Sequence, residues 1–359
     1  MAFLSFRNVR IAGFSTAVPK TVLTNEEADP ERYSAASFIN STGVRRHRVS
    51  EKYTAGDLCY EAAEQLISDL GWDKNEIEAI IFVSQHADYI LPATACILQD
   101  RLGLSQECYT ADLSLGCSGW VYGLSTIVSL LSCGGIKKAL LMSGDAKRRI
   151  NYVDPLFGHA GAVTAVEYQE GAAPMHFYFG TDGSGYDALI IPDGGARNQF
   201  SEKSFVPEDV EGHMLNRLQS RMKGMDVFSF GITWGPKSVR RLAEHFGFDY
   251  ADCDFYIFHQ ANLLIHQQLA KKLKVDIAKM PLCIDHFGNT STPAIPLLLS
   301  DVYGGEEDAR ELNVLMAGFG IGLSWGVMSA TINTADVLPV VETDDYFAEG
   351  VINSPADLL

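Results

Sequence analysis

The stretch that decides the fold is DLSLGCSGWVYGLSTIVSLL, residues 112–131. Its first part has the apolar character of a buried strand, and its second part has the apolar spacing of a helix. Cys117 lies at the junction, in a turn flanked by glycines. The start of a helix offers unpaired N–H groups and positive potential, which favour a thiolate and can hold an oxyanion. Cys117 is therefore a candidate nucleophile, although a buried thiol taken alone is more often structural.

The composition is that of a globular chain with excess negative charge. Its 359 residues are 47% hydrophobic, which suffices for one large or two medium cores. The net charge of −17 argues against nucleic acid as a partner, because phosphate backbones attract basic surfaces. The seven cysteines are scattered and contain no CxxC pair, so we predict neither disulfides nor a zinc site and expect a cytoplasmic location. Neither a signal peptide nor an apolar run long enough to span a membrane is evident.

The chain is similar to itself at an offset of about 175 residues. LGWDKNEIEAIIFVSQ (70–85) aligns with FGFDYADCDFYIFHQA (246–261), and LLMSGD (140–145) aligns with VLMAGF (314–319). In each repeat, short apolar runs such as KALLMSG and FYIFH alternate with helical periods, which predicts an α/β fold with parallel strands covered by helices. Two such halves packed face to face would bring matching strand ends to one shared site.

Two further polar residues follow predicted strands. His259 ends the run FYIFH, and Asn289 lies in the glycine-led turn GNTSTP. Either could be a structural residue, a satisfied histidine or a capping asparagine. The loop AGFGIGLSWG (317–326) has bare backbone amides that could complete an oxyanion hole. His266 lacks an evident third ligand, so a metal site is not predicted, whereas Cys117, His259 and Asn289 together suit activated-thiolate chemistry.

These motifs together resemble the thiolase-fold condensing enzymes, most closely the β-ketoacyl-acyl-carrier-protein synthase III family. STGVRRHR, DLSLGCSGWVYGL, LFGHAGAVTAVE, FHQAN, GNTSTPAIP and GFGIGLSWG carry the resemblance, in this order, over about residues 8–330. It implies an α/β thiolase-like fold, in which two duplicated βαβαβαββ halves pack as a layered α-β-α-β-α sandwich. The predicted halves are 1–175, with the cysteine, and 176–331, with the histidine and asparagine. A C-terminal extension follows at 332–359. The segment 196–224 has no counterpart in the first half, and we interpret it as an inserted lid with a loop and a helix, or as a partner surface.

The resemblance implies a two-step reaction between thioesters that needs no cofactor. Cys117 would take an acyl group from an acyl-CoA or acyl-carrier-protein thioester. His259 and Asn289 would then stabilise the enolate formed when a malonyl-type thioester loses CO₂, and this enolate would attack the acyl group to give a 3-oxoacyl product. Backbone N–H groups of Cys117 and Ile321 would form the oxyanion hole.

The resemblance also implies residues around the substrates. Arg45, Arg149 and Asn262 would contact CoA or the phosphopantetheine arm. Leu91 would close the acyl pocket of a neighbouring subunit, which implies a homodimer.

Several positions depart from the family pattern. Leu264 and Ser229 stand where the family carries basic residues that help dock an acidic carrier protein, and His159 stands in a loop that has an aspartate in the family. Weaker electrostatic steering of a carrier would follow. We therefore predict a role in a specialised rather than a housekeeping pathway.

Three alternatives compete with the condensing enzyme. An acyltransferase of the same fold would pass the acyl group to an amine, a hydroxyl or water, and a catalytically idle subunit would serve a heterodimeric synthase. A papain-like cysteine protease has the same chain order of Cys, His and Asn. However, Trp120 does not directly follow the cysteine, and Ala111 stands where a glutamine oxyanion donor would be expected.

Overall fold

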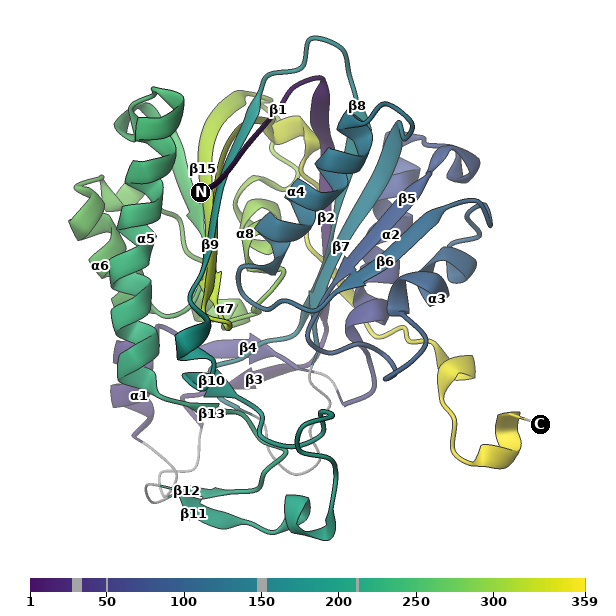
Figure 1. Cartoon of the computed structure of the whole chain (residues 1–359), viewed down its shortest axis with the longest axis vertical. Helices are drawn as coiled ribbons and strands as arrows, with labels where there is room; N and C mark the ends of the chain where they lie inside the picture. The colour runs from purple at the N-terminus through teal and green to yellow at the C-terminus, as the bar shows by residue number, and fades with distance from the viewer. Residues whose placement is uncertain (28–33, 50, 147–153, 211–212, 359) are drawn as a thin grey trace.

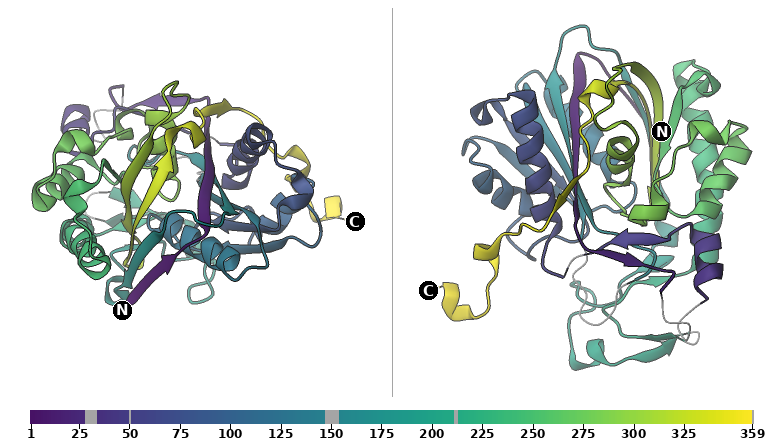
Figure 2. Two further views of the ribbon diagram at one scale, coloured as in Figure 1. Left: turned by 90° about the horizontal axis from the view of Figure 1, so that it is seen from above. Right: turned by 180° about the vertical axis from the view of Figure 1, so that it is seen from behind.

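The computed structural model describes residues 1–27, 34–49, 51–146, 154–210 and 213–358. Two sheets enclose a central pair of helices, and further helices cover both outer faces, which makes five layers (Figures 1 and 2). The central helices are α4 (Gly119–Ser132) and α8 (Ala294–Tyr303), as the view from behind in Figure 2 shows for α8. Outside the first sheet lie α2 (Ala55–Leu70) and α3 (Thr94–Arg101), and outside the second lie α5 (Gly224–Phe246) and α6 (Leu263–Leu273). The predicted layered α-β-α-β-α architecture is confirmed.

The two sheets have matching strand orders. The first sheet runs β17 (Val341–Thr343), β2 (Val9–Pro19), β8 (Ala160–Tyr168), β7 (Lys138–Asp145), β5 (Ala79–Val83) and β6 (Tyr109–Leu113). The second runs β1 (Ala2–Phe6), β9 (Met175–Thr181), β16 (Ser324–Asn333), β15 (Glu311–Gly320) and β14 (Phe255–Phe258). In both, two antiparallel pairs lead to a parallel pair, β7 with β5 and β15 with β14. Among the described strands, β6 has no counterpart in the second sheet.

The ends of the chain exchange sheets. Strand β1, at the start of the chain, pairs with β9 of the second sheet, and β17, near its end, pairs with β2 of the first. The strands predicted at KALLMSG and FYIFH are β7 and β14. Division of the chain at residue 175 stays a prediction, and the equivalent strand orders are in keeping with it.

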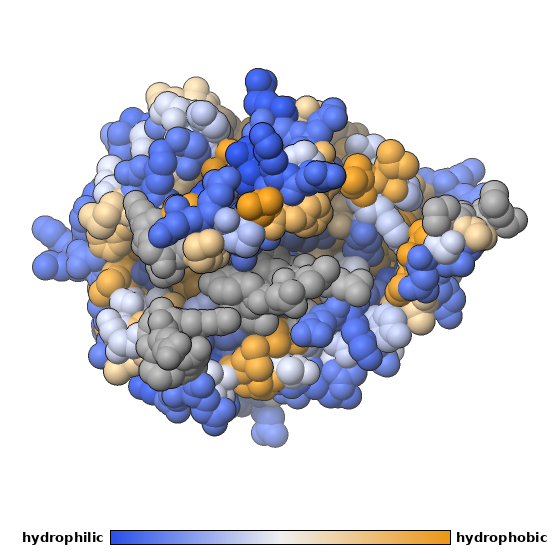
Figure 3. Space-filling model, turned by 90° about the horizontal axis from the view of Figure 1, so that it is seen from below, coloured by the Kyte–Doolittle hydropathy of each residue, from blue (hydrophilic) through white to orange (hydrophobic). Residues whose placement is uncertain are grey.

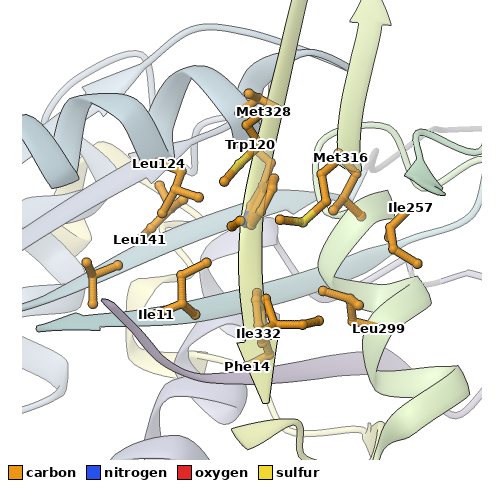
Figure 4. Packing of buried hydrophobic residues seen from close by; sticks show 14 of the residues in the cluster. Ile11, Phe14, Trp120, Leu124, Leu141, Ile257, Leu299, Met316, Met328 and Ile332 are labelled. Atoms are coloured by element: carbon orange, nitrogen blue, oxygen red, sulfur yellow. The ribbon is translucent and has the colours of Figure 1, made fainter. Parts of the chain in front are cut away.

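The central core explains why helix α4 is apolar on most of its surface. The helix lies between the sheets, so it buries Trp120 and Leu124 against residues of both, whereas a surface helix would need a polar face. Figure 4 shows Trp120 beside Met316 and Met328 of the second sheet and above Phe14 of the first. Such packing fixes the start of α4, and therefore Cys117, relative to both sheets.

Short elements complete the described structure. They are α1 (Ala35–Thr42), α7 (Ile284–Phe287) and three two-stranded pairs, β3 (Val22–Thr24) with β4 (Arg46–Arg48), β10 (Leu189–Ile190) with β13 (Arg221–Met222), and β11 (Glu208–Val210) with β12 (His213–Leu215). In the described part of the chain, no helix combines the length and the apolar character that crossing a bilayer requires.

The inserted segment differs from its prediction. Its described residues form one small hairpin, β11 with β12, one 3₁₀ turn and the strand β13, which pairs with β10. The helix of the predicted lid is therefore wrong, and the alternative of a partner surface stays a prediction. An ion pair between Asp193 and Arg217, at 2.8 Å, holds the segment together, and the Ser204 hydroxyl also donates to Asp193. Phe200 and Phe205 are more than half exposed, so the segment carries apolar side chains on its surface. Apolar residues interrupt the hydrophilic surface on the face of the molecule seen in Figure 3.

The C-terminal extension is anchored to the first half. After β17, the Phe347 N–H donates to Asp57 of α2 at 3.0 Å, and the Arg101 guanidinium lies 4.6 Å from the centre of the Phe347 ring. The Tyr89 hydroxyl donates to the carbonyl of Gly350. The last residues extend away from the body of the molecule beside α3 (Figure 1).

Candidate active site

Cys117 lies in the turn between β6 and α4. The turn is tight, because the Gly119 N–H donates to the Gly116 carbonyl at 2.6 Å. A side chain at Gly119 would come within 2.8 Å of Val83, so glycine lets the helix start close to β5. Cys117 is 9% exposed, which places the thiol inside the protein but near its surface. A thiol at this helix start faces the N-terminal potential that the sequence led us to expect.

The end of β15 passes directly against Cys117. A Cβ atom at Gly320 would stand 2.6 Å from the Cys117 Cβ and 3.2 Å from Sγ, and one at Gly318 would stand 2.5 Å from the Cys117 carbonyl oxygen. Only glycine fits at such distances. Ile321 follows, and its side chain reaches to 3.4 Å from the Cβ position of Gly116. The glycine loop of the second half thus contacts the turn of the first.

His259 follows β14 and is buried. Its N–H donates to the Ala317 carbonyl at 2.8 Å, which continues the pairing of β14 with β15. Burial lowers the pKa of the imidazole to about 4, whereas a hydrogen bond with the Ser291 backbone and the charge of Asp145 act in the opposite direction. The ring is therefore neutral at pH 7 and offers a neutral N–H or an acceptor.

Asn289 is held in the turn between α7 and α8. Its side-chain oxygen accepts the Ser291 N–H at 2.9 Å, and its NH₂ group donates to the Ala261 carbonyl at 3.4 Å, just beyond His259. These contacts fix the orientation of the carboxamide and leave its second N–H for a ligand.

Ser291 connects the three predicted residues. Its hydroxyl is 3.7 Å from the Cys117 sulfur, its N–H binds Asn289, and its backbone bonds the His259 ring. Its φ of 61° lies in the left-handed region that serine rarely adopts, a strain typical of functional sites. The structure thus brings the thiol, the imidazole and the carboxamide into one buried cluster. The sequence analysis missed Ser291, for which its place in GNTST was the only signal.

Comparison with known proteins decides the family. The profile described as 3-Oxoacyl-[acyl-carrier-protein (ACP)] synthase III matches residues 111–183, and that of the C terminal of this synthase matches residues 243–332. The β-ketoacyl-[acyl-carrier-protein] synthase III of Desulfitobacterium hafniense is 30% identical over 328 residues, which cover 89% of this chain and 96% of the relative. The chain belongs to the synthase III family. It is therefore a condensing enzyme that transfers acyl groups.

Other members of the family agree over nearly the whole length. The synthase III of Syntrophomonas wolfei is 32% identical over 330 residues, 89% of this chain and 96% of the relative. A crystal structure of 3-oxoacyl-(acyl-carrier protein) synthase from Burkholderia xenovorans LB400 superposes with a TM-score of 0.86 at 34% identity, covering 95% of this chain and 99% of that one.

Three residues of this synthase III family member extend the cluster behind Cys117, and the sequence analysis assigned none of them a role. Thr292 donates to the Gly116 carbonyl and contacts Asp145, each at 3.3 Å. Asp145, at the end of β7, also hydrogen-bonds Nδ1 of His86, which follows β5. Their positions at the carboxyl ends of parallel strands were the signal that could have revealed Asp145 and His86.

The residues predicted to contact substrate lie in different settings. The Arg45 side chain is exposed and pairs with Glu26 at 2.9 Å. The Asn262 oxygen accepts the Ile265 N–H at 2.8 Å and so caps α6. Leu91 is 79% exposed. Arg149 lies outside the described residues.

The other six cysteines occupy different environments from Cys117. Burial raises the pKa of the Cys59 and Cys283 thiols, and it raises those of Cys108 and Cys253 to about 11. Those four are poor nucleophiles at neutral pH, and the remaining two, Cys96 and Cys133, are exposed. Within the described residues, no three His, Cys, Asp or Glu side chains are grouped so as to hold a metal ion.

Proposed function

We propose that this enzyme joins an acyl group to a malonyl-type thioester by decarboxylating Claisen condensation, with Cys117 as the nucleophile. The observation that carries the proposal is the cluster around Ser291. It puts a thiol at a helix start, a neutral imidazole and an oriented carboxamide next to one another. The three groups match what the two half-reactions need.

In the first half-reaction, the Cys117 thiolate attacks the carbonyl carbon of an acyl thioester. The carbonyl oxygen becomes an oxyanion, which the backbone N–H groups of Cys117 and Ile321 stabilise. The donor's C–S bond then breaks, its thiolate leaves and takes from solvent the proton that the Cys117 thiol released there before the attack, and the acyl group remains on the Cys117 sulfur. The close approach of Gly320 to Cys117 supports this role for the loop, since it brings the two backbones together.

In the second half-reaction, His259 and Asn289 hydrogen-bond the thioester carbonyl of the malonyl donor. The carbon–carbon bond between the malonyl C2 and its carboxylate breaks, and CO₂ leaves. The electron pair of that bond stays on the donor and forms an enolate. The enolate carbon attacks the acyl group, a carbon–carbon bond forms, and the Cys117 thiolate is released. A His259 pKa of about 4 suits this role, because the neutral imidazole would pass its one N–H from the Ser291 backbone to the malonyl carbonyl without becoming charged.

We also infer that the enzyme works as a homodimer. Leu91 and its neighbour Ile90 are 79% and 93% exposed, and β6 is an edge strand of the first sheet. Exposed aliphatic side chains next to a free strand edge suit a surface that a second copy covers. Leu91 would then enter the partner's acyl pocket. Arg45, Asn262 and Arg149 would bind the CoA or phosphopantetheine arm of the substrates.

A specialised pathway fits the surface beside Asn262. Leu264 is exposed at the start of α6, and Ser229 is exposed in α5, where basic side chains would attract an acidic carrier protein. With a net charge of −17, the enzyme would attract such a carrier weakly.

Mass spectrometry after incubation with acyl-CoAs tests the first half-reaction. We expect an acyl adduct on Cys117 that disappears in Cys117→Ala and persists in Cys133→Ala, a control at an exposed cysteine. A malonyl thioester labelled with ¹³C at C2 tests the second, and the label should appear in a 3-oxoacyl product. An adduct without labelled product would instead indicate simple acyl transfer. No adduct with any acyl-CoA or acyl-carrier donor would indicate an idle subunit.

A further inference from the structure

Two polar side chains that the proposed half-reactions do not use lie next to the Cys117 turn. Gln85 and His86 follow β5, which lies between β6 and β7 in the first sheet. The three strands are parallel, so their carboxyl ends meet at one edge, where Cys117 follows β6 and Asp145 ends β7. The sequence places both residues at the catalytic edge of the sheet.

Gln85 lies against the nucleophile turn. Its side-chain oxygen is 2.7 Å from the point where a Cβ of Gly116 would stand, and the Ile321 side chain is 3.4 Å from the same point. Gln85 is exposed, and its amide has no hydrogen-bond partner among the described residues. The amide is therefore available to a ligand beside both proposed oxyanion donors.

The His86 ring is held in one orientation by a buried carboxylate. Its Nδ1 hydrogen-bonds Asp145, whose side chain is 3% exposed, and Asp145 in turn contacts Thr292 at 3.3 Å. Because a buried carboxylate accepts hydrogen bonds, Nδ1 donates to Asp145, and Nε2 on the other side of the ring is left to bond a ligand. His86 is partly exposed, and within the described structure Nε2 has no partner.

We propose that Gln85 and His86 form a polar subsite for the acyl group, and that this acyl group carries a hydroxyl. The inference rests on the proposed acylation of Cys117. A hydroxyl can donate or accept a hydrogen bond, so it can bond Nε2 of His86 and the Gln85 amide in either direction. A plain hydrocarbon chain would remove two polar side chains from water without replacing their hydrogen bonds. A carboxylate would bring a negative charge toward the Asp145 carboxylate.

The test compares acyl donors of similar size on the wild-type protein. Butyryl-CoA, its 2-, 3- and 4-hydroxy derivatives and succinyl-CoA are each incubated with the enzyme, and kcat/KM for acylation of Cys117 is measured by CoA release and by mass spectrometry. We expect at least one hydroxybutyryl donor to exceed butyryl-CoA about tenfold or more, as one well-placed hydrogen bond allows.

Two variants test the residues separately. Gln85→Leu and His86→Leu should each reduce the ratio of kcat/KM for the preferred hydroxybutyryl donor to that for butyryl-CoA to within about threefold. Gln169→Leu, a control at an exposed glutamine beyond β8, should leave the preference unchanged. If His86→Leu does not fold, Gln85→Leu alone tests the subsite. Gln85 is exposed and takes no part in the hydrogen bond between His86 and Asp145, so its replacement should not disturb folding.

The outcomes separate this inference from the proposed function. Adducts on Cys117 that form equally fast from butyryl-CoA and every hydroxy derivative would overturn the polar subsite and leave the condensing function standing. A preference for succinyl-CoA would overturn the hydroxyl in favour of an anionic acyl group. Absence of an adduct from all of these donors, on CoA or on a carrier protein, would overturn both.

Discussion

The turns that precede α4 and α8 occupy equivalent places in the two halves, and they carry different chemistry. In the first half, the turn after β6 presents Cys117, the proposed nucleophile. About 175 residues later, the turn before α8 presents Asn289 and Ser291, which can only form hydrogen bonds. The two turns touch, because the Thr292 hydroxyl donates to the Gly116 carbonyl at 3.3 Å. The site is thus assembled at the contact between two similar units, each supplying what the other lacks.

The histidines that follow β5 and β14, His86 and His259, also occupy equivalent places and differ in their surroundings. His259 is buried, and it meets the Asp145 carboxylate only through space. His86 is partly exposed and bonds the same carboxylate directly. One buried charge therefore acts on two imidazoles, one from each half. Under the proposed mechanism, the second half would supply hydrogen-bond donors, whereas the first half would supply the nucleophile and the Asp145–His86 hydrogen bond.

A change confined to the second half should separate the two half-reactions. We expect His259→Ala to lower the condensation rate by about 10²–10³-fold, the usual effect of removing one hydrogen-bond donor from a developing oxyanion. Acylation of Cys117 should stay within a few-fold of wild type, because in the proposed mechanism His259 acts on the malonyl donor. Mass spectrometry of acyl-enzyme in quenched samples measures the acylation rate, and formation of ¹³C-labelled product measures the condensation rate. Equal losses in both would contradict this division between the halves. His245→Ala, at an exposed histidine, serves as the control.

Acid pH should destabilise the second half in particular. Burial lowers the pKa of His266, on α6, to about 4 from 6.5 in the unfolded chain. As the pH falls, the unfolded chain therefore binds a proton at a higher pH than the folded protein does. The stability that the buried neutral ring provides is complete above pH 6.5 and is lost as the pH falls toward 4. We expect a loss of about 3 kcal/mol in the free energy of unfolding over this window, which His266→Leu should remove. Urea unfolding at pH 7 and pH 4 measures it. The same pH dependence in wild type and variant would refute the assignment.

Local patterns in the sequence predicted much of this structure, and contacts between distant segments account for the rest. Apolar periodicity located β7, β14 and α4, and the glycine-flanked turn singled out Cys117. Asp145 could not be assigned a role in the same way, because its role depends on Thr292, 147 positions away along the chain.

The C-terminal extension and the insertion, which have no counterparts in the repeat, also could not be predicted from local sequence patterns. The extension forms β17 because β2 offers a free edge, and no local pattern reveals that edge. One of the two predictions for the insertion was a lid with a helix, but its strands are two or three residues long, too short for a period-2 pattern to be visible.

The contact between the glycine loop and Cys117 is the third point to test. We expect Gly320→Ala to reduce acylation about 10²-fold, because the added methyl group would stand 2.6 Å from the Cys117 Cβ and displace the nucleophile. Gly135→Ala is the matched control, since no atom lies within 4 Å of the position of its Cβ. Single-turnover acylation measured for both variants gives the answer. A Gly320→Ala enzyme with normal acylation would show that the two halves do not need this close approach.

The smallest expected effect concerns a buried hydrogen bond between the halves. Ser118, at the start of α4, contacts the Ser324 hydroxyl of β16 at 2.7 Å, and Ser324 itself donates to the Ile321 carbonyl at 2.8 Å. Ser118 must therefore be the donor to Ser324. Ser118→Ala should cost about 1 kcal/mol in the free energy of unfolding, since only an acceptor is left without its partner. A double-mutant cycle with Ser324→Ala measures the coupling between the two residues. A coupling near zero would mean that apolar packing alone holds the start of α4 against the second sheet.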